Sequence, residues 1–118
     1  MRNDKKDNLI LEKTIAFAVN VIDYSEEIRS TNRFEMSSQI FRSGTSIGAN
    51  VTEAQNAESK ADFIHKFKIA AKEADEIAFW FSLCKLSKHY PNPPIELENE
   101  LKSIGLIISK IISSSKKK

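Results

Sequence analysis

The sequence has few residues that break helices, since only 3 of its 118 residues are glycine and 3 are proline. The prolines, Pro91, Pro93 and Pro94, fall in one short segment, and the rest of the chain contains none. Turn-dense β folds need both residue types at many points, and this scarcity argues against such a fold. The length suits one domain with a core of its own. We therefore expect residues 1–118 to form a single all-α domain.

Cysteine is almost absent as well, and long apolar stretches are missing. The lone cysteine, Cys84, excludes an intrachain disulfide and a cysteine-rich zinc site, and its apolar surroundings predict a buried thiol. Residues 1–7 carry charges where a signal peptide has its apolar core. No stretch reaches the ~18 apolar residues of a membrane-spanning helix. We expect a cytoplasmic protein that does not associate with membranes.

An excess of one charge is also lacking, because 18 Lys and Arg residues stand against 16 Asp and Glu residues. A net charge of +2 is too small to give a general affinity for polyanions, so nucleic-acid binding would need a local patch. The basic surplus lies in the second half of the chain. The candidate nucleic-acid contacts there are Lys60, Lys66, Lys68, Lys72, Lys102, Lys110, Lys116, Lys117 and Lys118.

The signals of common active sites are missing too. The chain has no glycine-rich phosphate loop, no dinucleotide fingerprint and no zinc-ligand spacing. Di-iron bundles need a Glu-x-x-His pair on each of two helices, and only Asp62 and His65 come near that pattern. Ser43, Ser46 and Cys84 have no histidine at a helical spacing that would activate them. We predict no enzymatic activity, no metal and no cofactor.

Apolar residues recur at helical spacing in four segments, which are separated by turn and cap residues. The predicted bounds are about 8–30, 34–57, 60–89 and 95–113, followed by a basic tail at 114–118 that we expect to be frayed. The pattern predicts a bundle of four helices, which the last segment closes.

The first predicted helix carries more apolar surface than one side of a small bundle can cover. One stripe consists of Leu11, Ile15, Ala18, Val19 and Ile22. A second, nearly opposite stripe consists of Ile10, Phe17, Val21, Tyr24 and Ile28. One stripe is expected to face the core and the other a second subunit, and the alternative is a helix buried centrally in its own chain. We assign the oligomer interface to Phe17, Val21, Tyr24, Ile28 and Trp80.

Polar side chains line one side of the second predicted helix, beside its apolar seam. They are Arg42, Ser46, Asn50 and Glu53. Arg42 needs an anionic partner if it is partly buried, and Glu73 and Glu76 are the candidates, so we predict one structural network of all six residues. In one alternative, the row lines an oligomer pore or a partner groove. In another, Glu73 and Glu76 are tuned acids of a small catalytic bundle. Gly44 and Gly48 indicate a closely packed neighbour.

The same helix carries a motif that extends into the next one. From Arg42 to Ala54 it reads Arg-Ser-Gly-Thr-Ser-Ile-Gly-Ala-Asn-Val-Thr-Glu-Ala, which contains Ser-Ile-x-x-Asn-x-x-Glu. Phe63 follows early in the third helix, and an alanine-rich stretch then leads to acidic and aromatic residues up to Trp80. These residues resemble the four-helix-bundle family named after the 23S rRNA intervening-sequence protein, also called S23-like, over most of the chain.

The resemblance implies an antiparallel up-and-down four-helix bundle that assembles into a ring, commonly a pentamer. Related proteins include the accessory variability determinant of diversity-generating retroelements, a basic barrel that binds a reverse transcriptase and nucleic acid. We therefore predict a non-enzymatic homo-oligomeric scaffold that binds RNA or DNA, or a nucleic-acid-processing partner such as a reverse-transcriptase-like protein, through the lysine surface. The alternative is a protein–protein interaction module with no nucleic-acid role.

Overall fold

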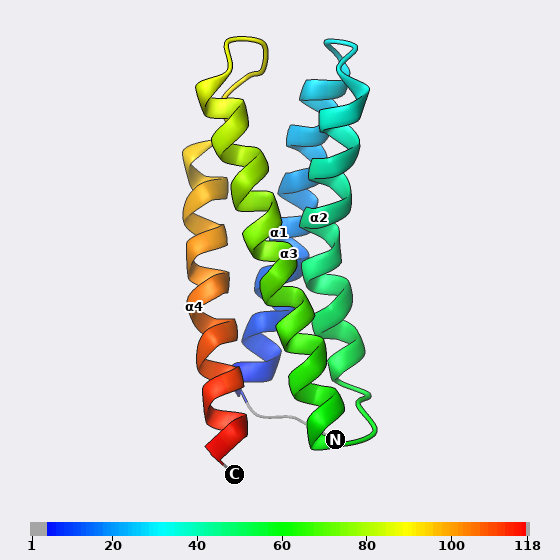
Figure 1. Cartoon of the computed structure of the whole chain (residues 1–118), viewed down its shortest axis with the longest axis vertical. Helices are drawn as coiled ribbons and strands as arrows, with labels where there is room; N and C mark the ends of the chain where they lie inside the picture. The colour runs from blue at the N-terminus through cyan, green and yellow to red at the C-terminus, as the bar shows by residue number, and fades with distance from the viewer. Residues whose placement is uncertain (1–4, 118) are drawn as a thin grey trace.

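The computed structural model describes residues 5–117, with the side chains of residues 9–117, so Lys118 lies outside the described residues. The helices run alternately up and down (Figure 1), and residues 5–117 contain no strand. The prediction of an all-α four-helix bundle is confirmed. The helices are α1 (Lys5–Arg29), α2 (Phe34–Ala54), α3 (Lys60–Leu86) and α4 (Ile95–Lys117).

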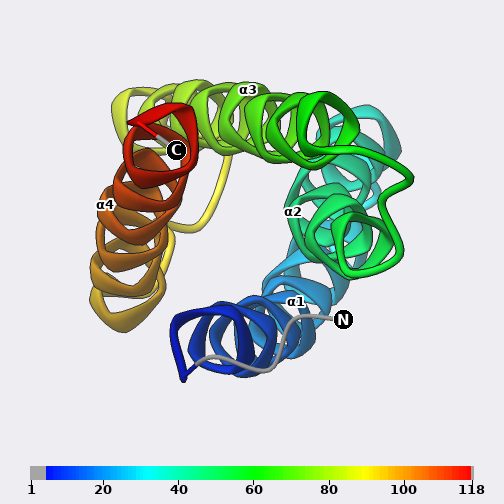
Figure 2. The ribbon, with the colours of Figure 1, turned by 90° about the horizontal axis from the view of Figure 1, so that it is seen from below.

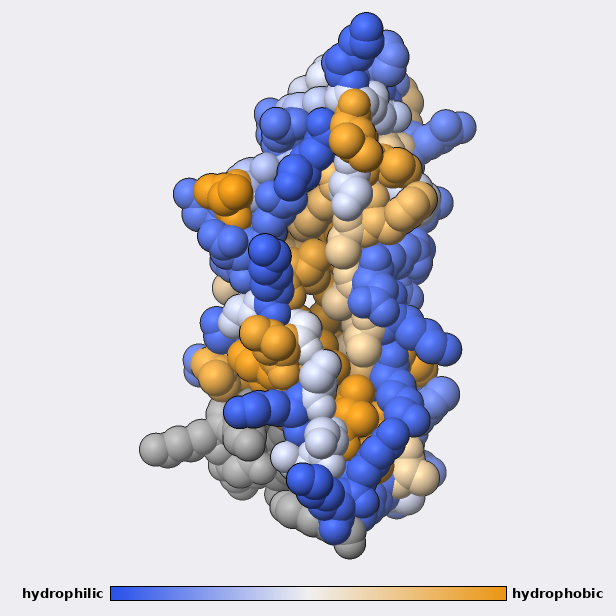
Figure 3. All heavy atoms as spheres, turned by 60° about the vertical axis from the view of Figure 1, so that its left-hand side comes forward, coloured by the Kyte–Doolittle hydropathy of each residue, from blue (hydrophilic) through white to orange (hydrophobic). Residues whose placement is uncertain are grey.

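The four helices are arranged in chain order around a common core. α2 packs closely against both α1 and α3, and α4 completes the bundle against α3 and α1. Seen along the bundle, α1 and α4 stand farther apart than the other neighbouring helices (Figure 2). The side on which α4 comes forward shows hydrophobic surface along a vertical hollow, bordered by hydrophilic side chains (Figure 3). The seam between α1 and α4 is therefore the most open side of the bundle.

The core consists of apolar side chains that recur every three or four residues on each helix, as the sequence pattern predicts. Close packing of these side chains from all four helices removes a large apolar area from water, and this burial is the main stabilising term of the fold. The largest fully buried side chains are Phe17, Phe67, Ile10, Ile28, Ile40, Ile47, Ile77, Leu97, Ile104, Ile108, Val21 and Val51.

The predicted oligomer interface on the first helix is wrong, because the structure places that stripe in the core of the chain itself. Phe17, Val21, Tyr24 and Ile28 are all buried by their own bundle. The aromatic stripe faces inward because burying Phe and Tyr rings removes more apolar area from water than burying smaller side chains. The opposite stripe, which includes Val19, faces outward.

Several helix ends differ from their predicted bounds. α2 ends at Ala54 rather than at 57, because the N–H of Asn56 already bonds a carbonyl three residues back, as in a tight turn. α3 ends at Leu86 rather than at 89, because Ser87 is extended. α4 continues to Lys117, where we predicted a frayed tail, and lysines in its last turn suit the negative end of the helix dipole. α1 begins at residue 5 rather than 8.

We expect Gly44→Ala to destabilise the bundle by about 1–2 kcal/mol, despite the better helix propensity of alanine. An added Cβ would lie 2.6 Å from Cγ1 of Val21 and 2.9 Å from Cδ1 of Ile77. Because the β-branched Val21 is stiff, α1 and α2 would have to separate. The matched control is Gly105→Ala, since nothing lies within 4 Å of a Cβ there. Thermal unfolding should show a lower Tm for Gly44→Ala and an equal or higher one for Gly105→Ala. The same effect for both would contradict this packing.

Candidate functional site

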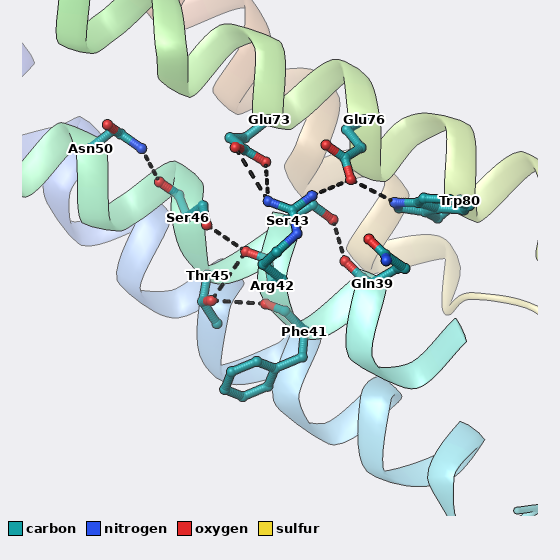
Figure 4. Close-up of polar contacts among 10 residues, drawn as sticks. All are labelled: Gln39, Phe41, Arg42, Ser43, Thr45, Ser46, Asn50, Glu73, Glu76 and Trp80. Atoms are coloured by element: carbon teal, nitrogen blue, oxygen red, sulfur yellow. Dashed lines mark hydrogen bonds and ion pairs between the residues drawn. The ribbon is translucent and has the colours of Figure 1, made fainter. Parts of the chain in front are cut away.

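A polar network joins α2 to α3 at their solvent-facing seam (Figure 4). Nη1 of Arg42 donates to Oε1 of Glu73 at 3.2 Å, and Nη2 of Arg42 donates to Oε2 of Glu76. Oε2 of Glu76 also accepts from Nε1 of Trp80 at 3.1 Å. The sequence proposed Glu73 or Glu76 as the partner of Arg42, and the guanidinium binds both carboxylates.

The network is electrostatically satisfied but not sealed from water. The side chain of Arg42 is 47% exposed, whereas Glu73 and Glu76 are partly covered. The hydrogen bond from Arg42 lowers the pKa of Glu76, and the bond from Trp80 lowers it further. The same bond to Glu76 raises the pKa of Arg42. A carboxylate held ionised in this way is a poor proton donor near neutral pH, so the arrangement favours the structural interpretation over the catalytic one.

The other three residues of the predicted network do not join it through their side chains. Oγ of Ser46 donates to the backbone carbonyl of Arg42 at 2.6 Å, and Nδ2 of Asn50 donates to the carbonyl of Ser46 at 2.9 Å. Glu53 instead pairs with Lys66 at 2.9 Å. Short polar side chains on a helix commonly bond the carbonyl four residues back, and this local bond competes with contacts between helices. The six predicted residues therefore form an Arg42–Glu73–Glu76 network, two local bonds within α2 and a separate ion pair of Glu53 with Lys66.

We expect Glu76→Gln to flatten the loss of stability in acid. Because the folded-state pKa of Glu76 is lowered, its stabilisation is present above the unfolded pKa, near ~4.3, and is lost as pH falls through the folded pKa. The pair is partly exposed and screened by water, so the loss at neutral pH should stay within about 1 kcal/mol. Urea unfolding at pH 7 and at pH 3 measures both effects. Glu35→Gln is the control, and an unchanged acid dependence in Glu76→Gln would refute the coupling.

Lysines of α3 and α4 converge near one end of the bundle. The salt bridge of 3.1 Å between Lys85 and Glu98 sets the antiparallel register, which places Lys68 opposite the last turns of α4. The charge of Lys116 lies close enough to Lys68 to lower its pKa, and Lys72, one turn along α3, lowers it further. Across residues 9–117, none of these three lysines forms an ion pair with a carboxylate. We call Lys68, Lys72 and Lys116 the lysine cluster.

The remaining predicted nucleic-acid contacts differ from the lysine cluster. Lys66 is neutralised by Glu53, and the bond between them raises its pKa. The others whose side chains the structure describes lie exposed on the surface, and they are Lys60, Lys102, Lys110 and Lys117. Of the eight predicted lysines that the structure describes, it therefore brings Lys68, Lys72 and Lys116 together.

An uncharged apolar surface covers the outer side of the α1–α2 seam. Ile15 and Val19 of α1 are 58% and 54% exposed, and Phe41 of α2 is 47% exposed. Phe41 points away from the α3 network (Figure 4). Beneath this surface Gly48 of α2 lies against Thr14 of α1, and both residues are buried, so the two helices pack closely. Exposed apolar surface of this kind is typical of an interaction site.

We call this surface the α1–α2 face. It is formed by Leu11, Ile15, Ala18, Val19, Ile22, Phe41, Thr45, Ala49 and Thr52. The sequence analysis identified the α1 residues as a stripe but assigned the interface to the opposite one, and it missed Phe41. The sequence does indicate this part of the face, because Phe41, Thr45 and Thr52 recur at helical spacing with no charge among them.

Trp80, the fifth predicted interface residue, is half-buried. Its ring lies 5.2 Å from the ring of Phe79 in a tilted arrangement, and its place in an oligomer interface stays a prediction.

Candidate nucleophiles and metal ligands lie in unsuitable places. Oγ of Ser43 is buried and donates to the carbonyl of Gln39 at 2.8 Å. Cys84 is fully buried, and burial raises the pKa of its thiol, which disfavours the nucleophilic thiolate. Among the described residues, no three His, Cys, Asp or Glu side chains gather as a metal site requires. Within the same part of the chain, no helix combines the length and apolar character needed to cross a membrane.

Comparisons with known proteins identify similar chains. The family model described as 23S rRNA-intervening sequence protein matches residues 6–110. A solved structure from Bacteroides thetaiotaomicron VPI-5482, described as a protein of unknown function from the S23 ribosomal protein family, is 40% identical with a TM-score of 0.84. The match covers 92% of this chain and 98% of that one. No curated protein matches the chain.

Proposed function

The chain belongs to the 23S rRNA-intervening sequence protein family, and from this premise we propose that it is a non-enzymatic, self-associating scaffold that binds the phosphate backbone of RNA or DNA. The observation that carries the proposal is the lysine cluster, in which Lys68 of α3 and Lys116 of α4 come close together and neither forms an ion pair across residues 9–117. Like charges held together disfavour each other unless an anion neutralises them. A phosphate group supplies that charge.

The chemistry of the cluster indicates how it would bind. Lysine ammonium groups act as mobile point charges on phosphates and lack the planar geometry with which arginine recognises bases. Aromatic side chains on which bases could stack are absent from the cluster itself. We therefore expect binding without sequence preference and with a strong dependence on salt concentration.

Self-association would repeat the cluster around an assembly. The α1–α2 face has no charged member, so two copies can bury it without desolvating an ion. Family resemblance favours a ring of five copies, which would carry a net charge of about +10, five times +2. Several weak phosphate sites on one assembly bind a long nucleic acid much more tightly than one site does. We place this scaffold in the cytoplasm, where a reverse-transcriptase-like protein is a further candidate partner.

The experiment uses wild-type protein that has been treated with nuclease during purification and freed of the nuclease. A labelled RNA is then added. Fluorescence anisotropy is recorded with one single-stranded and one duplex RNA over a range of salt concentrations. We expect both RNAs to bind at low salt and to lose affinity steeply as salt rises. Binding releases cations from the RNA phosphates, and a higher salt concentration makes that release less favourable. No binding at the lowest salt would overturn the proposal and favour the protein–protein interaction module.

A further inference from the structure

The open seam between α1 and α4 contains two hollows with apolar floors. The first, of about 250 Å³, is lined by Ala16 on α1 and Ile104 on α4. The second, of about 280 Å³, is lined by Tyr24 on α1 and Leu97 on α4. Both lie along one seam, whose open side is the hollow visible in Figure 3. We call the two hollows together the α1–α4 groove.

The spacing of the two hollows matches the repeat of a helix. Seven residues separate Leu97 from Ile104, and eight separate Ala16 from Tyr24, so the hollows lie roughly 10–12 Å apart along the groove. Apolar side chains at positions i and i+7 of a helix are spaced by about 10.5 Å. Each hollow has room for one or two large apolar side chains. A helix laid along the seam could therefore place one anchor in each hollow.

The rim of the groove is acidic, although the chain as a whole is slightly basic. The described residues that line the hollows include five carboxylates and one lysine, Lys13. The carboxylates are Glu12, Asp23, Glu27, Glu96 and Glu100. Within the described part of the chain none of them is neutralised by an ion pair.

Glu100 connects the two hollows, because it lines the first and bonds Asn20, which lines the second. Both of its carboxylate oxygens accept from Nδ2 of Asn20 across the seam, at 3.1 and 3.2 Å. The amide is uncharged, so this contact does not neutralise the carboxylate. The groove therefore combines two apolar hollows with a rim in which carboxylates outnumber the one lysine.

We propose that the α1–α4 groove binds a basic amphipathic helix of a partner protein. Its apolar side chains at i and i+7 occupy the two hollows, and its Lys and Arg side chains pair with the rim carboxylates. Nucleic acid is disfavoured in this groove because its phosphates would meet carboxylates. The groove is also separate from the lysine cluster, which involves α3 and the far turns of α4. The binding of a partner helix is therefore independent of the proposed RNA binding.

The test uses the full chain and fluorescence anisotropy with labelled model peptides of about 18 residues, long enough for a bound helix. One peptide carries leucine at i, i+3, i+7 and i+10 with lysine elsewhere, a second replaces every lysine by glutamate, and a third replaces every leucine by serine. We expect the first peptide to bind and the other two to fail. Equal binding of the glutamate peptide or of the serine peptide would overturn the proposal.

Variants locate the binding site. Asp23→Lys with Glu27→Lys should weaken the leucine–lysine peptide about tenfold or more, since two rim attractions become repulsions. The matched control, Glu58→Lys with Asp75→Lys, makes the same change in net charge away from the groove and should leave binding within about twofold. Equal weakening by both double variants would show only general charge attraction and would refute the site.

A second pair of variants tests the hollow itself. Ala16→Trp fills the first hollow from an exposed position, so it should weaken the peptide while thermal unfolding stays unchanged. Ala61→Trp, on the exposed side of α3, is its control. Undiminished binding to the Ala16→Trp variant would contradict anchoring in this hollow.

Discussion

Val19→Asp is expected to convert the assembly into folded monomers. Val19 is 54% exposed on the α1–α2 face, so aspartate there stays hydrated in the single chain. In an assembled interface the same carboxylate would be buried without a partner, at a cost of about 3–5 kcal/mol for each contact. That cost corresponds to a weakening of association by more than about 100-fold. Light scattering should then give the 13.4 kDa of one chain.

The control for this result is Ile95→Asp. Ile95 is also an exposed apolar side chain, but it lies in the first turn of α4, where an acidic group suits the helix dipole. We expect Ile95→Asp to keep the mass of the wild-type assembly, and circular dichroism should show both variants folded. A wild-type mass in Val19→Asp would mean that the copies associate through another surface.

Replacing Lys68 and Lys116 together by glutamine is expected to produce the largest loss of RNA binding. Each lysine lost removes one phosphate contact, so the slope of log affinity against log salt should become shallower by about 1.4 for a single-stranded RNA. Affinity at low salt should fall about tenfold or more, because several copies act on one RNA. Anisotropy titrations at four or more salt concentrations measure both quantities.

The matched control replaces Lys85 and Lys88 by glutamine. It makes the same change in net charge near the other end of α3, and Lys85 is already paired with Glu98 at 3.1 Å. The salt slope of this control should remain that of the wild type. If both double variants lose affinity equally, net charge rather than the lysine cluster determines binding.

The helices were predictable from the sequence because apolar residues repeat every three or four positions with few glycines and prolines to interrupt them. The helix ends were less predictable, because they depend on local hydrogen bonds. Ser59, for example, caps the start of α3, where its Oγ accepts from the N–H of Asp62 at 3.0 Å. The end of α2 at Ala54 depends on a tight turn for which the sequence has no glycine or proline signal.

The choice between the two apolar stripes of α1 could not be made from periodicity alone. Both stripes repeat at helical spacing, and only the packing against α2 distinguishes them. Gly44 admits Val21, and Gly48 lies against Thr14, so the two small residues of α2 receive the inner side of α1. The large side chain of Phe17 also favours burial of this stripe, but only in combination with the two glycines does it identify the inner side of α1.

Some polar contacts were predictable from the sequence, and others depend on the packing of the helices. The pairing of Arg42 with Glu73 and Glu76 was predictable, because a guanidinium at a helix seam requires carboxylates from the neighbouring helix. The convergence of Lys68 with Lys116 was not, because these residues lie far apart in the chain and meet only through the register of α3 and α4. The acidic rim likewise combines residues from the first and last helices.

The three surfaces can be occupied at the same time because they lie on different sides of the bundle. The α1–α2 face is apolar, the lysine cluster on α3 and α4 is basic, and the α1–α4 groove is acidic. This separation of chemistry suits a scaffold that associates with copies of itself, with a nucleic acid and with a protein helix. It also makes the corresponding variants independent tests.

The most direct test of the scaffold is the absolute mass of the wild-type protein by light scattering at low and high salt, with absorbance at 260 and 280 nm recorded on the same peak. We expect an assembly that survives high salt, about 67 kDa for five copies of 13.4 kDa, and that carries nucleic acid only at low salt. A monomer without nucleic acid at both salt concentrations would contradict the account.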